Sequence, residues 1–180
     1  FQKRKASRLI GFLGAIIFFQ VVMLYQKRQR QSVNEFIVFQ KSRSSIIAQR
    51  NGDNLSVYHT LDSLQLVNDN VINQYKVGVG NLIIEMNDTI SNIYQFQDKR
   101  ILIIDSLGVY QINNLKPEIV ILQQSPKVNL TRMIDSLKPK LIIADGSNYK
   151  SYIKYWGETC EQKNTPFYST SQKGAYILKD

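Results

Sequence analysis

Three patterns of hydrophobic and polar residues follow one another along the chain. Residues 9–25 are apolar on every side of a helix, with Gln20 as their one strongly polar side chain. Short runs rich in β-branched and aromatic residues follow between residues 34 and 60. From residue 116 onward, continuous apolar runs alternate with amphipathic segments. These patterns predict, in turn, a membrane helix, a group of short strands, and a unit in which strands and helices alternate.

The apolar segment 9–25 is long enough to cross a bilayer. At 1.5 Å per residue its length reaches about 25 Å, and flanking side chains that extend to the headgroups compensate for the difference from a core of about 30 Å. Cations lie before it at Lys3, Arg4, Lys5 and Arg8, and after it at Lys27, Arg28 and Arg30. No small-residue cleavage site follows it, which argues against a signal peptide. Four cations against three leave the side of the membrane that holds the remaining chain undecided.

The first half of the remaining chain is predicted to be rich in strands. The sequence NGDN between two apolar runs is typical of a hairpin turn. A helix is expected over 64–75, and VGVG at 77–80 is expected to be a loop or the start of a strand, since a phosphate loop needs a third glycine. The strands are expected at 34–40, 44–50, 54–60, 91–97 and 100–106.

The second half is predicted to hold parallel strands. Strand, helix, strand, helix and two further strands are expected at 117–124, 129–138, 139–146, 148–164, 166–170 and 174–180. A continuous apolar strand is covered on both faces, and helices between strands imply parallel crossovers. The fold class is therefore α/β, in an α+β layered form. The domains are a membrane helix with basic flanks over residues 1–30 and a body over residues 31–180.

The net charge of +9 belongs to the N-terminal segment. Residues 1–50 hold ten Lys and Arg residues and one acid, whereas residues 51–180 hold thirteen of each sign. A body with a balance of zero does not favour a polyanion-binding protein. The cations expected to contact phosphates or lipid headgroups are therefore those close to the membrane exit, namely Lys27, Arg28, Arg30, Lys41 and Arg43.

Polar side chains follow two of the predicted parallel strands. Gln123, Gln124 and Ser125 come after one strand, and Asp145 comes after the next. Parallel strands end at the same edge of a sheet, where α/β proteins usually place their chemistry. The chain has one histidine and one cysteine, which excludes the usual zinc sites and any internal disulfide. No cofactor is expected.

Several short motifs resemble the C-terminal part of the ComEC family, the polytopic channels of bacterial DNA uptake. The motifs are FIVFQKSRSSIIAQRNGDNLSVYH after the membrane helix, EIVILQQS, LKPKLIIADGSN and PFYSTSQKGAYIL. The versions ADGSNYKSY and TSQKGAYIL are similar to those of Bacteroidetes-type bacteria. The resemblance covers essentially the whole chain and makes residues 9–25 the last membrane helix of a multi-pass protein of the inner membrane.

The resemblance also implies a metallo-β-lactamase-like domain that has lost its metal ligands. Such hydrolases use a His-x-His-x-Asp-His cluster with further His and Asp residues. Here the residues from 60 to 118 contain no histidine, and glutamines stand where the family has His-His-Gly-Ser. Amides are neutral and poor zinc ligands. Gln123, Gln124, Ser125 and Asp145 are therefore interpreted as the vestigial positions of a site without catalytic residues or a metal.

The resemblance thus predicts the non-catalytic C-terminal part of a membrane channel for DNA uptake in natural transformation. Its partners would be the lipid bilayer, an upstream transmembrane bundle of the same chain, single-stranded DNA and other competence proteins. One alternative is a metal-dependent nuclease or phosphodiesterase built around Asp105, Gln123, Gln124 and Asp145. A second alternative is a membrane-anchored assembly module with no role in DNA handling.

Overall fold

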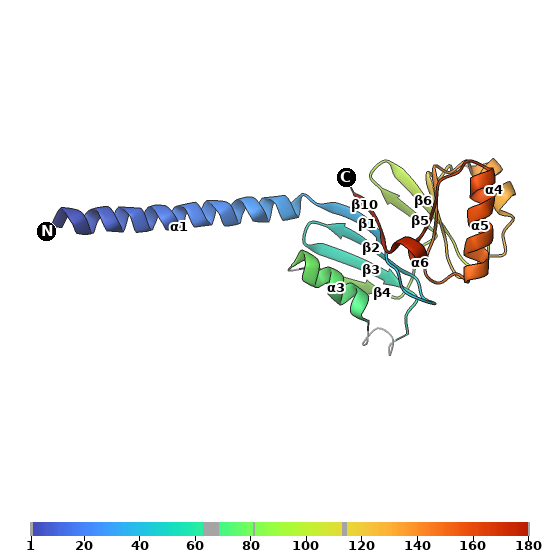
Figure 1. Ribbon diagram of the computed structural model, residues 1–180, viewed down its shortest axis with the longest axis horizontal. Helices are drawn as coiled ribbons and strands as arrows, with labels where there is room; N and C mark the ends of the chain where they lie inside the picture. Colours follow the sequence, from blue (N-terminus) through green and yellow to red (C-terminus); the bar gives the residue numbers. More distant parts are fainter. Residues whose placement is uncertain (1, 63–68, 81, 113–114, 180) are drawn as a thin grey trace.

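A long N-terminal helix extends away from the rest of the molecule. The structure is a computed structural model that describes residues 2–62, 69–80, 82–112 and 115–179. Helix α1 (Gln2–Gln31) projects from the body as a single rod (Figure 1). Its stretch Leu9–Gln29 has a mean hydropathy of 2.0, and none of its most apolar window is buried against the body. This agrees with the predicted membrane helix in length and composition.

The first sheet is mostly antiparallel and has the order β10-β1-β2-β3-β4. Only the β3–β4 pair is parallel. Gly52 has a φ of +61° in the two-residue connection between β2 and β3, so the predicted hairpin turn is confirmed. The strands are β1 (Asn34–Val38), β2 (Ile46–Asn51), β3 (Asn54–His59), β4 (Ile83–Asn87) and β10 (Tyr176–Lys179).

The second sheet is mostly parallel and has the order β5-β6-β7-β8-β9. Strands β6 to β9 run parallel to one another, and β5 pairs antiparallel with β6 at the edge. Every residue of β7 is buried, as its continuous apolar sequence predicts. The strands are β5 (Ile93–Phe96), β6 (Lys99–Ile104), β7 (Ile119–Leu122), β8 (Leu141–Ala144) and β9 (Phe167–Ser169).

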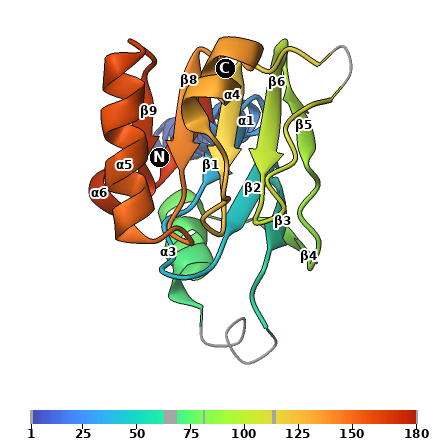
Figure 2. The ribbon, with the colours of Figure 1, turned by 90° about the vertical axis from the view of Figure 1, so that its right-hand side faces the viewer.

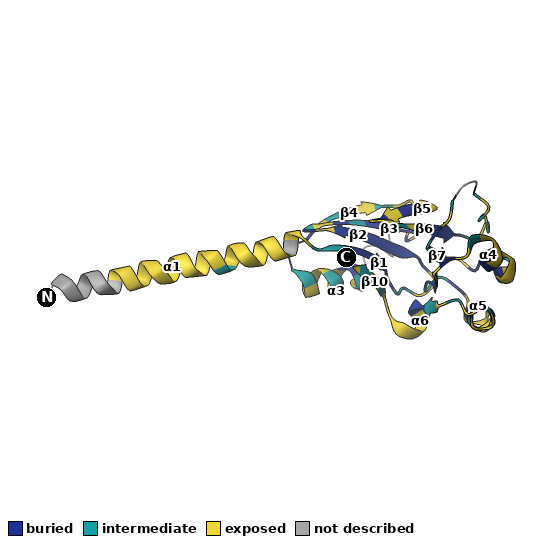
Figure 3. Cartoon of the chain, turned by 90° about the horizontal axis from the view of Figure 1, so that it is seen from above, coloured by how far each residue is buried: buried dark blue, intermediate teal, exposed yellow. Residues whose placement is uncertain are grey.

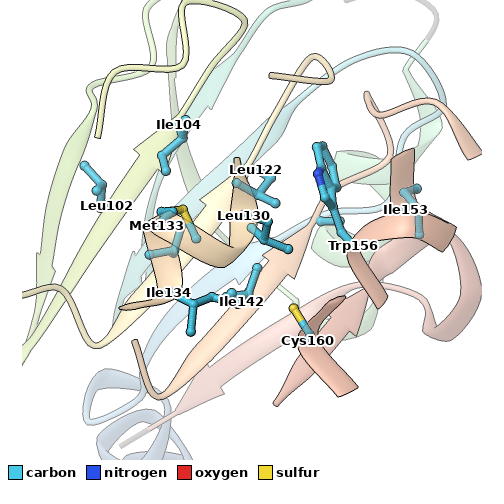
Figure 4. Close-up of a cluster of buried hydrophobic side chains, with 12 residues drawn as sticks. Leu102, Ile104, Leu122, Leu130, Met133, Ile134, Ile142, Ile153, Trp156 and Cys160 are labelled. Carbon is cyan, nitrogen blue, oxygen red and sulfur yellow. The ribbon is translucent and has the colours of Figure 1, made fainter. Parts of the chain in front are cut away.

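The two sheets pack face to face, with helices on their outer faces. Phe36 of β1 and Ile121 of β7 belong to one apolar cluster between the sheets. Helix α3 (Asn70–Val79) covers the outer face of the first sheet. Helices α4 (Leu130–Leu137) and α5 (Lys150–Gln162) cover the second, in front of it in Figure 2, with Met133 and Trp156 in the cluster of Figure 4. The buried strands in the middle and the exposed helix surfaces are visible in Figure 3. The body is thus a mixed α/β fold.

Three local differences separate the structure from the sequence prediction. The predicted helix at 64–75 begins at Asn70, after the N-cap Asp69, and residues 64–68 lie outside the described part of the chain. The expectation of a loop at VGVG was wrong, because α3 continues to Val79. Strand β4 and the short helix α6 (Thr170–Lys173) were not predicted. Their sequences are short and carry no clear period.

Candidate functional site

The candidate site lies where β7 and β8 end. Leu122 and Ala144 are paired in register, so Gln123 and Asp145 are neighbours just beyond the last pair. Side chains alternate along a strand, which places both on the side of Ile121 and Ile143, facing the first sheet. The structure therefore brings together the side chains that the sequence analysis singled out. We call the surrounding group the strand-end cluster, which comprises residues 40–45, 123–125, 145–148 and Thr170.

Asp145 is the buried carboxylate of this cluster. Its exposed fraction is 0 %. Its Oδ1 accepts hydrogen bonds from the Ser147 backbone N at 3.0 Å, from Ser147 Oγ at 2.5 Å and from Asn148 Nδ2 at 3.0 Å. Burial raises the pKa of Asp145 to about 6, although the hydrogen bonds from Ser147 favour the charged form. The site thus holds a carboxyl group whose charged form is poorly solvated.

The other carboxyl oxygen of Asp145 faces the first sheet without a partner. Asp145 Oδ2 and Ser45 Oγ are both buried, and neither makes a hydrogen bond within the described residues. The Ser45 hydroxyl is nevertheless close enough to lower the pKa of Asp145. A proton on Oδ2 could be donated to Ser45 Oγ, which would satisfy both atoms. The Ser45 hydroxyl could equally donate to a carboxylate, so it is burial and not Ser45 that favours the neutral carboxyl group.

The loops after β7 and β8 are joined by hydrogen bonds between side chains and backbone. Asn148 Nδ2 donates to the Leu122 carbonyl at 2.6 Å, and Asn148 Oδ1 accepts from the Ser125 backbone N at 2.8 Å. Ser147 Oγ accepts from the Gln124 backbone N at 2.7 Å. These bonds occupy the side-chain polar atoms of Ser147 and Asn148. The Asp-Gly-Ser-Asn sequence after β8 therefore acts as a local connector.

A loop of the first sheet closes the cluster from the other side. The Arg43 backbone N donates to the Gly146 carbonyl at 2.9 Å. A Cβ atom on Gly146 would lie 2.2 Å from the Lys41 carbonyl oxygen, so only glycine fits there. Thr170 Oγ1 donates to Gln40 Oε1 at 2.5 Å and joins the end of β9 to the same loop. The backbone of residues 40–43 therefore occupies the space directly over the ends of the strands.

The two glutamines are in different environments. Gln123 is 2 % exposed, and its Nε2 has no hydrogen-bond partner within the described residues. Gln124 is exposed and has a φ of +57°. Asp105, at the end of β6, accepts a hydrogen bond from the Leu107 backbone N at 3.0 Å within its own turn. The residues of the alternative nuclease site thus lie at one edge of the sheet, but Gln123 and Asp145 are buried, whereas Gln124 is exposed and Asp105 holds its own turn.

The donor set does not fit a hydrolytic metal site. Within the described ranges no group of three or more His, Cys, Asp or Glu side chains could hold a metal ion. Asp145 supplies the one carboxylate of the strand-end cluster, and Gln123 supplies a neutral amide. His59 lies 4 % exposed at the end of β3, where its Nδ1 accepts from the Leu61 backbone N at 3.3 Å. It is a buried strand-end histidine that holds its own turn.

The five cations expected to contact phosphates or headgroups are divided between two places. Lys27, Arg28 and Arg30 belong to α1. Lys41 and Arg43 follow β1, at the end of that strand opposite to α1 (Figure 1). Lys41 Nζ also forms an ion pair with Asp69 at 2.8 Å, and Asp69 caps α3. Lys41 and Arg43 are therefore close to the membrane helix in the sequence but not in space.

A second polar cluster, not anticipated from the sequence, lies at the opposite end of β1. Glu35 is 4 % exposed and accepts from the Tyr75 hydroxyl, from Arg50 Nη1 at 3.4 Å and from Lys179 Nζ at 3.0 Å. Burial raises the pKa of Glu35, but these partners outweigh it and hold the pKa below its usual value. No sequence signal indicated it, since its members are far apart in the chain. The cluster joins β1, β2, β10 and α3 next to α1.

Comparison with known proteins gives one family. The family model described as the ComEC C-terminal domain matches residues 36–180. The match includes the whole strand-end cluster and excludes α1. Neither the search of curated proteins nor that of solved structures found a match.

Proposed function

The chain belongs to the ComEC C-terminal domain family, which indicates a role in the uptake of DNA during competence, and we propose that its body is a non-catalytic part of the uptake channel. In this role the body is a structural or docking element, and passage of DNA depends on membrane segments other than α1. The family also makes this a membrane protein, in accord with its apolar N-terminal helix.

The observation that carries the proposal is the burial of Asp145 under the loop of residues 40–43. A metal-dependent hydrolase needs an open coordination position for water and substrate. Here the carboxyl group has an exposed fraction of 0 %, and the Gly146 carbonyl is bonded to the Arg43 backbone N. Opening the site would require breaking contacts that join the two sheets. The strand-end cluster therefore suits a connector between the sheets better than a catalytic centre.

The layered architecture supports descent of the body from a metallo-β-lactamase-like hydrolase. Two five-stranded sheets pack face to face with helices outside, and the polar residues lie at the ends of parallel strands. We propose that Gln123, Gln124, Ser125 and Asp145 are the remaining positions of that site. The backbone N atoms of Gln124 and Ser125 now donate to Ser147 and Asn148, and Asp145 accepts hydrogen bonds from the same two residues.

We further propose that α1 is the last helix of a multi-pass protein in the inner membrane. Its partners would be the bilayer, an upstream transmembrane bundle of the same chain, single-stranded DNA and other competence proteins. The support is the family membership together with the span Leu9–Gln29.

A cleavage assay on the full chain tests the non-catalytic role. The protein in detergent micelles is incubated with Mn²⁺, Mg²⁺ or Zn²⁺ and with labelled single- or double-stranded DNA, next to Asp145→Asn. The proposal expects no cleavage above a metal-only blank in any combination. Metal-dependent cleavage that is lost in Asp145→Asn, with its folded spectrum retained, would replace the proposal with the nuclease alternative. Asp105→Asn then shows whether the neighbouring carboxylate takes part.

The alternative without a DNA role is tested in cells. The gene is deleted and then restored with the wild type or with the Asp145→Asn variant, and natural transformation is scored. The proposal expects loss of transformation on deletion and full restoration by both versions. Undiminished transformation in the deletion strain would favour an assembly module with no DNA role.

A further inference from the structure

The junction between α1 and the body is short and packed. α1 ends at Gln31 and β1 begins at Asn34. The Gly52 backbone N donates to the Val33 carbonyl at 2.8 Å, and a Cβ on Gly52 would lie 3.1 Å from the Gln31 carbonyl oxygen. The β2–β3 turn is therefore pressed against the end of the helix. Such a junction holds one end of the body at a fixed place relative to the bilayer.

That end of the body lies close to the headgroups. The apolar run ends at Tyr25, and six further helical residues reach Gln31, about 9 Å along the axis. The headgroup layer on each side of a bilayer is about 5–7 Å thick. A spanning helix is also tilted by about 20° on average, which brings one side of the attached body nearer to the lipid. Side chains at this end can therefore reach the membrane surface.

Two of the most exposed apolar side chains in the body lie at this end. In Figures 1 and 3, the C-terminal end of α3 and the start of β4 lie level with the end of α1. Val77, in the last turn of α3, is 85 % exposed, and Ile83, the first residue of β4, is 70 % exposed. The Ile83 backbone N donates to the Asp53 carbonyl at 2.8 Å, which fixes it beside the β2–β3 turn. Both apolar side chains are thus exposed at the end of the body where α1 is attached.

Cations lie at the same end. Lys76 is exposed in the last turn of α3, and Lys27, Arg28 and Arg30 lie on α1 just before the body. A groove of about 510 Å³ at this end is lined by Ser32, Val33, Asn34, Glu35, Arg50, Val79 and Lys179. Glu35 is paired with Lys179 and Arg50, Asp53 is half-buried in the turn, and Glu85 is exposed two residues beyond Ile83. Cations around an apolar tip suit a surface of anionic lipid.

We propose that this end of the body rests on the bilayer, with a membrane-facing tip of Lys76, Val77 and Ile83 inserted among anionic headgroups. The lipid surface is the occupant because α1 brings the bilayer to this end, and the exposed Lys76 and the cations of α1 complement anionic lipid. The contact fixes the orientation of the body, since β1 then leads away from the membrane and carries the strand-end cluster at its far end. The inference depends on α1 as a membrane span and not on the non-catalytic role of the cluster.

Fluorescent labels at single introduced cysteines in the full chain test this contact. Val77→Cys and Ile83→Cys are compared with Leu107→Cys, a matched control that is 78 % exposed in the turn after β6. Cys160 is buried, and burial raises the pKa of its thiol to about 12, so it is not labelled in the folded protein. The variants are reconstituted in phosphatidylcholine vesicles with about 30 mol % phosphatidylglycerol, whose negative charge attracts basic side chains.

Two quenchers distinguish the outcomes. A lipid with a nitroxide at headgroup depth is expected to quench the labels at positions 77 and 83 several-fold more than the label at position 107. Iodide in the aqueous phase is expected to quench the label at position 107 more than the other two. Iodide quenching equal to that of Leu107 at both tip positions would overturn the proposal. Protection from iodide without lipid quenching, growing with protein density, would replace the lipid with a second copy of the chain. Lipid quenching that does not change with protein density supports the proposal.

Discussion

The Arg43 backbone N lies 2.9 Å from the Gly146 carbonyl oxygen and donates a hydrogen bond to it across the gap between the two sheets. The two residues belong to loops that follow β1 and β8, which are far apart in the chain. This contact places backbone where an α/β enzyme would leave an opening for substrate. It also places Ser45 opposite the buried Asp145 carboxyl group. The strand-end cluster therefore contributes to holding the sheets together.

The stability of the protein should depend on the protonation of Asp145. Burial raises its pKa to about 6 from an ordinary value near 4, so the folded state binds the proton more tightly than the unfolded state does. The stabilisation from the neutral carboxyl group is therefore complete below pH 4 and is lost as the pH rises through 6. A shift of two units corresponds to about 3 kcal/mol in the free energy of unfolding.

The Asp145→Asn variant should remove this dependence. We expect it to be more stable than the wild type at pH 8 by up to about 3 kcal/mol and to approach it near pH 4. The measurement is urea unfolding in detergent micelles, followed by the fluorescence of Trp156, the single tryptophan, which is 1 % exposed. Asp105→Asn, at the half-exposed position after β6, is the control and should follow the wild-type profile. If the free energy of unfolding changed with pH in the same way for Asp145→Asn and the wild type, the Asp145 carboxyl group would be solvated and not buried.

Gly146→Ala should destabilise the body because there is no room for a methyl group. Its Cβ would lie 2.2 Å from the Lys41 carbonyl oxygen, which is backbone and cannot move freely. Overpacking of this kind costs about 1–3 kcal/mol, and here the contact between the loops would also be lost. Gly78→Ala is the matched control, since nothing lies within 4 Å of its Cβ and α3 would gain up to about 1 kcal/mol. Equal midpoints for the two variants in urea would show that the loops separate at little cost.

The buried Glu35 cluster should stabilise the end of the body next to α1. Glu35→Gln leaves Arg50, which is 6 % exposed, without its counterion, and we expect a loss of about 3 kcal/mol at pH 7. Because the pKa of Glu35 is lowered, the effect is present above the pKa of the unfolded chain and disappears as the pH falls through that of the folded state. Tyr75→Phe removes one hydroxyl and should cost only about 1–2 kcal/mol. A Glu35→Gln variant as stable as the wild type at pH 7 would show that Arg50 is hydrated.

The sequence was sufficient for the elements with a strong period. The helix at 129–138 and the buried runs before and after it became α4, β7 and β8, because amphipathic spacing and continuous apolar character decide these elements locally. The end of α3 could not be predicted, since Gly78 has a low helix propensity but Val79 packs against the first sheet. Tertiary packing outweighed the local preference there.

The sequence predicted where the candidate site lies, but it did not predict that a loop of the other sheet covers the site. Parallel strands place Gln123 and Asp145 side by side, and this follows from the order of elements alone. The loop that covers them comes from the other sheet, so its contacts depend on a pairing about one hundred residues away in the chain. The same holds for the Thr170 hydroxyl and Gln40. Long-range contacts of this kind leave no local pattern in the sequence.

Deletion of residues 1–30 should convert an integral membrane protein into one that alkaline carbonate extracts. The remaining chain has no apolar run near eighteen residues, the length that a spanning helix requires. Some of the truncated protein should still sediment with anionic vesicles at low salt, because the membrane-facing tip is retained. Carbonate extraction of membranes and immunoblotting measure the first effect. Retention of the truncated protein in the carbonate pellet would contradict the assignment of the span to α1.

The cations in two separate places should differ in their effect on DNA binding. Lys27, Arg28 and Arg30 lie on α1, where anionic headgroups compete for them at about 1 kcal/mol each. Lys41 and Arg43 lie at the far end of β1, and Lys41 is already paired with Asp69. If the chain binds DNA through the three cations of α1, replacing them with glutamine reduces the slope of log affinity against log salt by about 2 for single-stranded DNA.

Replacing Lys41 and Arg43 with glutamine should reduce that slope by about 0.7 at most, a third of the effect of the helix cations. The reason is that Lys41 contributes its charge to Asp69, which leaves the exposed side chain of Arg43 to contact a phosphate. Binding of labelled single-stranded DNA to the full chain in detergent, at several salt concentrations, measures both slopes, and membrane insertion is checked for each variant. A larger loss of slope from the Lys41 and Arg43 replacement would move the DNA contact to the strand-end cluster. Identical slopes for the wild type and both variants would show that none of these five cations contacts DNA and that they interact with lipid headgroups or stabilise the fold.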